Sequence, residues 1–172
     1  MSFEATNEGI GAGQFWRALG ARPVGATVIS TSGDDGPEGF LGLSFAHVSA
    51  QPPTVLVSTG KSTSALASIR RTGCFAANVL PANAEKVARA FGGDLPRQSR
   101  FKDLAWSTFI TSAPVLDLAT AVFDCRVLRE IEEEGAIIFL GRVVGVKSAE
   151  TGQALIAFQG GYLNILEAVS RP

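Results

Sequence analysis

The sequence is poor in the residues that most often bind metals or form disulfides. Its 172 residues include one histidine and two cysteines, and Cys74 and Cys125 lie far apart in apolar segments. A His/Cys metal centre is therefore not expected, and neither is a disulfide framework. Both thiols are expected to be free and buried, as is usual for proteins of the reducing cytoplasm.

Charge is also scarce, and the two signs are balanced. Only 18% of the residues are charged, the formal net charge is -1, and Lys and Arg are scattered singly. This excludes the basic surface that nucleic-acid binding requires. Residues 1–13 lack the pattern of a signal peptide, and no stretch is long and apolar enough to cross a bilayer. We expect a cytoplasmic protein with a flexible segment at 1–13 and a single domain at 14–172.

The apolar pattern predicts a mainly β protein with a few short helices. Ser62 and Asn83 are expected to cap two of the helices, and Gly73 is expected to end one. The strands are mostly antiparallel, and closure of six or seven of them into a small barrel would remove the sheet edges. The predicted helices are 14–20, 62–71 and 84–91, and the predicted strands are 24–31, 39–45, 54–59, 74–80, 119–131, 136–147 and 154–166.

Two neighbouring segments favour binding of a planar, phosphate-bearing ligand. Lys61-Ser62-Thr63-Ser64 stands at a predicted helix start, where free backbone N–H groups, hydroxyls and an ammonium can bind a phosphate. The alternative is that Ser62 only caps the helix and Lys61 is solvated. Gly42–Phe45 ends a strand with small residues, which allow another molecule to approach the backbone. Its alternative is a bulge or a barrel corner.

Evidence for acid–base catalysis is weak. His47 is the only candidate general base, and it lacks a recognisable partner, so a structural role is the simpler interpretation. The acidic cluster at 130–134 stands at a hairpin tip and is expected to be solvated. Without a nucleophile–base pair, hydrolysis is disfavoured, whereas a redox cofactor carries the reacting electrons itself.

The chain resembles the flavin reductase-like family, whose fold is an FMN-binding split β-barrel of Greek-key type. The resemblance runs from about Phe15 to Leu166. Its motifs, in order, are Ser-Phe-x-x-Val-Ser-x-x-Pro-Pro at 44–53, Lys-Ser-Thr-Ser at 61–64, Phe-Ala-Ala-Asn-Val-Leu at 75–80, Phe-Gly-Gly at 91–93, Arg-Phe at 100–101, Ile-Phe-Leu-Gly at 138–141 and Phe-x-Gly-x-Tyr at 158–162.

The resemblance implies a set of ligand contacts. Near the flavin these are Gly42, Leu43, Ser44 and Phe45 at the ring edge, Ser58 and Thr59 at the ribityl chain, and Lys61, Ser62 and Ser64 at the phosphate. Phe91, Arg100 and Phe101 are implied to cover the flavin, and Gly160 and Tyr162 to flank the nicotinamide.

The implied activity is hydride transfer from NADH or NADPH to FMN or FAD by a homodimer, with the reduced flavin passing to a partner monooxygenase. The chain departs from the family at one motif: many members carry Gly-Asp-His where this chain has Glu134-Gly135-Ala136. Two alternatives therefore stay open. One is a flavoprotein that retains FMN and reduces another acceptor, such as a metal chelate or corrin; the other is a flavin-binding protein without nicotinamide turnover.

Overall fold

Seven antiparallel strands form the main sheet, in the order β3-β2-β6-β9-β10-β5-β4. The computed structural model describes residues 9–150 and 152–163. The longest hairpin joins β9 (Ala121–Glu132) to β10 (Ala136–Ser148), as the sequence predicts. The other five strands are β2 (Thr27–Ser32), β3 (Pro37–Leu41), β4 (Ala46–Ala50), β5 (Pro53–Gly60) and β6 (Cys74–Val79).

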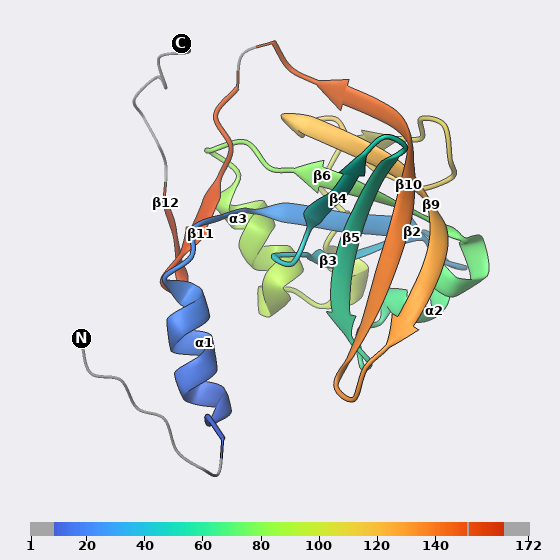
Figure 1. Ribbon diagram of the computed structural model, residues 1–172. Helices are drawn as coiled ribbons and strands as arrows, with labels where there is room; N and C mark the ends of the chain where they lie inside the picture. Colours follow the sequence, from blue (N-terminus) through green and yellow to red (C-terminus); the bar gives the residue numbers. More distant parts are fainter. Residues whose placement is uncertain (1–8, 151, 164–172) are drawn as a thin grey trace.

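The sheet curls on itself because its two edge strands are consecutive in the chain. Only residues 42–45 connect β3 to β4, so the two edges must lie close together. Gly42 marks this closure: a Cβ there would lie 2.5 Å from Ile29 Cγ1 on β2 and 3.4 Å from Val57 Cγ2 on β5. In Figure 1, β5, β10 and β9 accordingly cross in front of β2 and β6. The predicted split β-barrel class is confirmed.

Helix α2 (Ala65–Thr72) packs its apolar face into the barrel core. Leu66 and Ile69 are buried there, as predicted, with Phe75 and Phe139. Gly73 ends the helix in the left-handed conformation, with a φ of 64°, which also agrees with the sequence. The predicted start is wrong: Ser64, not Ser62, occupies the N-cap position. Three consecutive hydroxyl residues could each cap a helix, so the pattern alone did not fix the position.

A second apolar cluster lies outside the barrel, beneath the segment that follows β6. This segment contains α3 (Glu85–Arg89), the π-helix η1 (Ala90–Asp94) and the 3-10 helix η2 (Arg97–Ser99). Ala84, not Asn83, is the N-cap of α3, so that prediction is wrong. Phe91 and Phe101 form a buried edge-to-face pair with ring centroids 4.9 Å apart.

The remaining strands are short. The strand predicted at 24–31 is interrupted at Ala26, and the one predicted at 154–166 is split by a turn, with 164–166 outside the described residues. The sequence did not predict β4, whose residues lie on an exposed edge. The small strands are β1 (Val24–Gly25), β11 (Ile156–Phe158) and β12 (Gly161–Leu163), which form one sheet, and β7 (Trp106–Ser107) and β8 (Val115–Leu116), which form another.

The N-terminal helix α1 (Ala12–Gly20) begins two residues earlier than predicted and stands apart from the curled sheet (Figure 1). None of its residues is buried, and Trp16 is 65% exposed. Residues 1–8 of the predicted flexible segment lie outside the described part of the chain.

Both cysteines are free and buried, as expected from their apolar surroundings. Burial raises the pKa of the Cys125 thiol to about 12. Within the described residues, no helix is both long and apolar enough to span a bilayer.

Asp124 holds the loop that precedes β8 against the sheet. Its carboxylate is fully buried and accepts hydrogen bonds from the backbone N–H groups of Ile110 and Thr111, at 2.8 and 2.7 Å, and from the Thr111 hydroxyl. We therefore expect Asp124→Ala to lower the free energy of unfolding by about 3 kcal/mol, because buried donors lose a charged acceptor. Urea denaturation measures this change. The exposed Asp117→Ala is the matched control, and equal stability of the two variants would contradict this role for Asp124.

Candidate functional site

A cavity of about 670 Å³ lies between the α2 entry and the η1–η2 segment. One wall is rich in hydroxyl groups, another is apolar, and two arginines complete the lining. The described residues that line it are Ser58, Thr59, Gly60, Ser62, Thr63 and Ser64, then Phe40, Leu41, Leu43, Phe91 and Gly92, and finally Arg97 and Arg100. The predicted residues among them are Leu43, Ser58, Thr59, Ser62, Ser64, Phe91 and Arg100.

The hydroxyl wall is the turn that joins β5 to α2. The turn is closed by a hydrogen bond from the Thr63 N–H to the Gly60 carbonyl, at 3.0 Å, and by one between the Thr59 and Thr63 hydroxyls, at 2.6 Å. Ser64 adopts a helical backbone and makes no side-chain capping bond. Its hydroxyl is therefore not committed to the helix and can bind an anion beside the first N–H groups of α2.

The cationic groups of the cavity come from the opposite wall. Arg100 Nη1 donates to the Gly39 carbonyl at 2.9 Å, which fixes this guanidinium beside β3. Arg97 Nη2 lies 3.8 Å from Glu38 Oε1, and the Arg97 side chain is about half exposed. The sequence did not predict Arg97 as a site residue, because it lies in a segment without a regular apolar pattern. Its spacing of three residues from Arg100 could have indicated that both side chains lie on one side of a helical turn.

Lys61 does not line the cavity in this structure. Its ammonium donates a hydrogen bond to Glu132 Oε1 at 2.7 Å. That bond holds the pKa of the Glu132 carboxyl below its usual range. Both side chains are well exposed, and exposed ion pairs stabilise a fold only weakly. The phosphate-binding role of Lys61 stays a prediction and would require the ammonium to leave Glu132.

The turn at 42–45 contributes one lining residue, Leu43, and otherwise holds the neighbouring strand in place. The Ser44 hydroxyl donates to the Ser58 carbonyl at 2.8 Å and accepts from the Ser58 N–H at 2.9 Å, which ties the turn to β5. Phe45 packs against Phe123 at the barrel core. Leu43, which is 39% exposed, is the residue of this turn that reaches the cavity. Direct ligand contacts by Gly42, Ser44 and Phe45 stay predictions.

The residues predicted on the nicotinamide side lie elsewhere in the fold. Gly160 forms the turn between β11 and β12, and Tyr162 follows on β12 with its ring 5.6 Å from the Arg89 guanidinium carbon. Burial raises the pKa of Tyr162. His47 is exposed on edge strand β4, opposite Val55. Neither Tyr162 nor His47 lines the cavity, and their roles remain predictions.

Ala136 lies next to the cavity through strand pairing. It stands opposite Gly60, at the end of β5 where the hydroxyl turn begins. The motif in which this chain departs from Gly-Asp-His is therefore adjacent to the cavity rim. A methyl group at this position leaves the rim without an imidazole.

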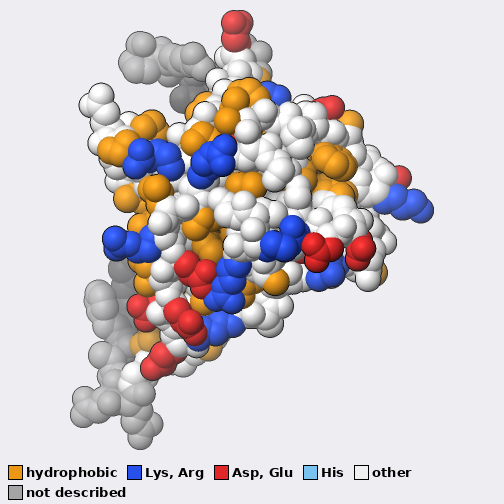
Figure 2. All heavy atoms as spheres, turned by 90° about the vertical axis from the view of Figure 1, so that its right-hand side faces the viewer, with side chains coloured by type: hydrophobic (Ala, Val, Ile, Leu, Met, Phe, Trp, Pro, Cys, Tyr) orange, Lys and Arg blue, Asp and Glu red, His pale blue; other side chains and the backbone are white. Residues whose placement is uncertain are grey.

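The cavity is built to bind rather than to transfer protons. None of its described lining residues is a carboxylate, histidine or cysteine. No cluster of three or more metal-ligating side chains occurs in the described ranges 9–150 and 152–163. On the face shown in Figure 2, basic and acidic side chains lie beside one another rather than in separate areas. Arg97 and Arg100, with no acidic residue among the described lining residues, give the cavity a positive charge.

Comparisons with known proteins identify the family to which the chain belongs. Residues 19–166 match the family model described as the flavin reductase like domain. The FMN reductase (NADH) RutF of Bradyrhizobium diazoefficiens is 34% identical over 145 residues, which cover 84% of this chain and 81% of that protein.

Solved structures with the same fold include two proteins of related description. The NADH:FAD oxidoreductase SgcE6 of Streptomyces globisporus C-1027 has a TM-score of 0.83 at 30% identity, covering 90% of this chain and 93% of that one. It has also been solved in complex with NAD and FAD fragments. A nitrilotriacetate monooxygenase component B homologue from Mycobacterium thermoresistibile has a TM-score of 0.84 at 28% identity, covering 92% and 89% of the two chains.

Proposed function

Since this chain belongs to the flavin reductase like domain family, we propose that it is an NAD(P)H-dependent flavin oxidoreductase. It transfers a hydride from NADH or NADPH to FMN or FAD. The main structural support for this proposal is the cavity, which combines a hydroxyl-rich turn, an apolar wall and two guanidinium groups. Relatives named as NADH-dependent FMN and FAD reductases support the same activity.

The residues of the cavity fit a flavin phosphate. Ser62, Ser64 and the N–H groups at the α2 start can donate to phosphate oxygens, and Arg97 can add a charge-assisted bond. Leu43 and Phe91 supply the apolar surface that an aromatic ring system requires. The charge and polarity of the lining therefore match both ends of the ligand.

We expect the chain to promote hydride transfer by positioning the two reactants. A bound flavin supplies the redox chemistry, because its ring accepts the hydride. Ser44 and Ser58 hold the β5 end against the turn at 42–45, which fixes the apolar wall. Phe91, which packs edge-to-face on Phe101, supplies apolar surface on the opposite side. The described lining residues include no carboxylate, histidine or cysteine that could transfer a proton, which suits a reaction governed by the distance and orientation of two reactants.

Reduced flavin is the product that leaves this enzyme for a partner monooxygenase. Two similar proteins support this role: a homologue of nitrilotriacetate monooxygenase component B, and the flavin reductase component of a two-component tryptophan halogenase. The hydroxyl turn and Leu43 are partly exposed, which would allow a reduced flavin to leave the cavity.

Anaerobic mixing with NADH and then NADPH tests the proposed function. We expect the visible absorbance of added FMN or FAD to bleach at a rate that depends on enzyme concentration. Binding of flavin without bleaching would contradict the reductase function and leave the flavin-binding alternative, which the absence of a histidine at Ala136 favours. Dialysis of the complex separates a diffusible flavin from a retained one.

The contribution of Arg97 is tested by comparing two flavins. We expect Arg97→Ala to weaken FMN binding by about tenfold or more, because a charge-assisted bond to the phosphate is lost. Riboflavin, which has no phosphate, should bind both proteins equally. Flavin fluorescence titration measures both affinities. Arg22→Ala, at an exposed arginine outside the cavity, is the control. Equal loss of riboflavin affinity would show that Arg97 supports the fold instead.

We also propose that the protein is a homodimer and acts in the cytoplasm. The exposed apolar residues of α1 support the first point, because Phe15 and Trp16 are 47% and 65% exposed. Such side chains are normally covered when they form a patch. The two buried free thiols support the second, since they suit a reducing compartment.

Light scattering during size exclusion tests the dimer. We expect twice the chain mass for the unchanged protein and a shift toward one chain mass for Trp16→Glu, because a charge would be buried in an apolar interface. Arg17→Glu, an exposed neighbour on the same helix, is the control. A single-chain mass for the unchanged protein at micromolar concentration would contradict the proposal.

A further inference from the structure

The Lys61–Glu132 ion pair lies beside the hydroxyl turn that we propose for phosphate binding. Lys61 directly precedes Ser62, which lines the cavity, but its ammonium donates to Glu132 Oε1 at the end of β9, at 2.7 Å. The strand registers place Glu132 opposite Ile137, and Ile137 opposite Thr59, where the turn begins. Lys61 therefore stands between two acceptors for its charge: a carboxylate on β9 and the phosphate that the turn would bind.

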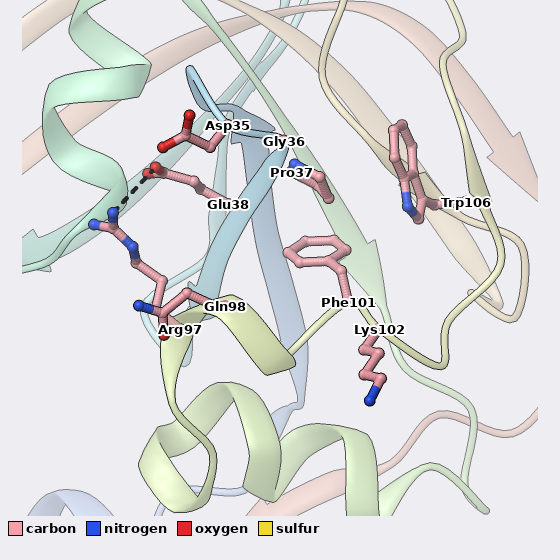
Figure 3. A pocket seen from close by; sticks show the side chains of 9 residues that line it. All are labelled: Asp35, Gly36, Pro37, Glu38, Arg97, Gln98, Phe101, Lys102 and Trp106. Carbon is pink, nitrogen blue, oxygen red and sulfur yellow. Dashed lines mark ion pairs between the residues drawn. The ribbon is translucent and has the colours of Figure 1, made fainter.

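The arginines of the opposite wall behave differently from this lysine. Arg97 and Arg100 both line the cavity, although Arg97 also has a carboxylate nearby. Figure 3, which views an adjoining pocket lined by Arg97 and Glu38, shows these two side chains facing each other from η2 and β3. Their ion-pair distance is 3.8 Å, which is longer than a hydrogen bond. Lys61 is hydrogen-bonded to Glu132 and is not among the lining residues.

A neighbouring ion pair on β9 is held more firmly. Arg70 Nε lies 3.0 Å from both carboxylate oxygens of Glu130, and Arg70 Nη2 donates a further hydrogen bond to Glu130 Oε1. Among the described residues, Lys61 and Glu132 are joined by one hydrogen bond, and their side chains are 40% and 64% exposed. A single exposed ion pair of this kind is weak, so a phosphate close by can replace the carboxylate as the partner of the ammonium.

We propose that Glu132 is a positioning residue that competes with the flavin phosphate for Lys61 and thereby weakens the binding of phosphate-bearing flavins. The inference rests on the proposed function. Phosphate binding by Lys61 requires the bond to Glu132 to break, and the cost of breaking it lowers the apparent affinity. The hydroxyl turn and the two arginines still select for a phosphate. Glu132 therefore favours release of the reduced flavin without removing the preference for a phosphorylated one.

Flavin fluorescence titration of Glu132→Gln tests the competition. We expect the Kd for FMN to fall about threefold, which is the size of effect that an exposed ion pair permits. The Kd for riboflavin, which has no phosphate, should stay the same. Glu130→Gln is the matched control, because it removes the same charge from a carboxylate of β9 that is paired with Arg70 instead. An unchanged Kd for FMN overturns the proposal, and so does an equal fall for riboflavin or in the control variant.

A double-mutant cycle with Lys61→Met shows whether Glu132 acts through the lysine. Methionine keeps most of the length of the side chain and removes its charge, so we expect Lys61→Met to weaken FMN binding. Adding Glu132→Gln to Lys61→Met should leave the Kd for FMN unchanged, because the group for which the two anions compete is missing. If Glu132→Gln strengthens FMN binding equally with and without Lys61, the carboxylate repels the phosphate directly and the positioning role is refuted. FMN binding that Lys61→Met does not weaken refutes it as well.

The outcomes separate this inference from the function on which it rests. If NADH bleaches the bound FMN but Glu132→Gln does not change the Kd for FMN, the role of Glu132 is refuted and the reductase function stands. If Glu132→Gln binds FMN more tightly through Lys61 but neither NADH nor NADPH bleaches it, the reductase function fails and the competition for Lys61 stands. A protein that binds no flavin refutes both.

Discussion

The fold depends on closure of one sheet through a four-residue turn. The chain passes directly from edge strand β3 to edge strand β4, which forces β2 and β5 to meet at Gly42. Ser44 secures the closure by exchanging two hydrogen bonds with the Ser58 backbone. Because Ser58 also lines the main cavity, the contact that closes the barrel helps to position the lining of the proposed binding site. Closure of the barrel and the shape of the cavity therefore depend on the same pair of hydrogen bonds.

The two walls of the cavity supply different chemical groups. Hydroxyls and N–H groups come from the β5–α2 turn, and guanidinium groups come from the η2 segment, so the two walls are held by separate parts of the fold. Each wall has its own anchor: the Thr59–Thr63 hydroxyl pair on one side and the Arg100–Gly39 bond on the other. A ligand that spans the gap contacts both walls without requiring either to change its internal hydrogen bonds.

Segments with a regular apolar pattern could be predicted from the sequence. Contacts between residues far apart in the chain could not. The β9–β10 hairpin and the inward face of α2 follow from apolar patterns that persist over several turns or strand repeats. Edge strand β4 was missed because an exposed edge carries no clear alternation. The Lys61–Glu132 pair could not be predicted, since it depends on the strand registers that align the end of β9 with the end of β5 across β10. Arg97 likewise acquires its place only when η2 folds over β3.

The η1–η2 segment also has a consequence for solubility. Strand β3 ends the main sheet, and an open strand edge is a template for pairing with other chains. Here Arg100 occupies the Gly39 carbonyl, and the Phe91 and Phe101 rings approach Gly39 so closely that a Cβ there would lie 3.1 and 3.3 Å from them. The cover that forms a ligand wall thus blocks edge-to-edge aggregation. Displacement of this segment would leave the β3 edge open to pairing with strands of other chains.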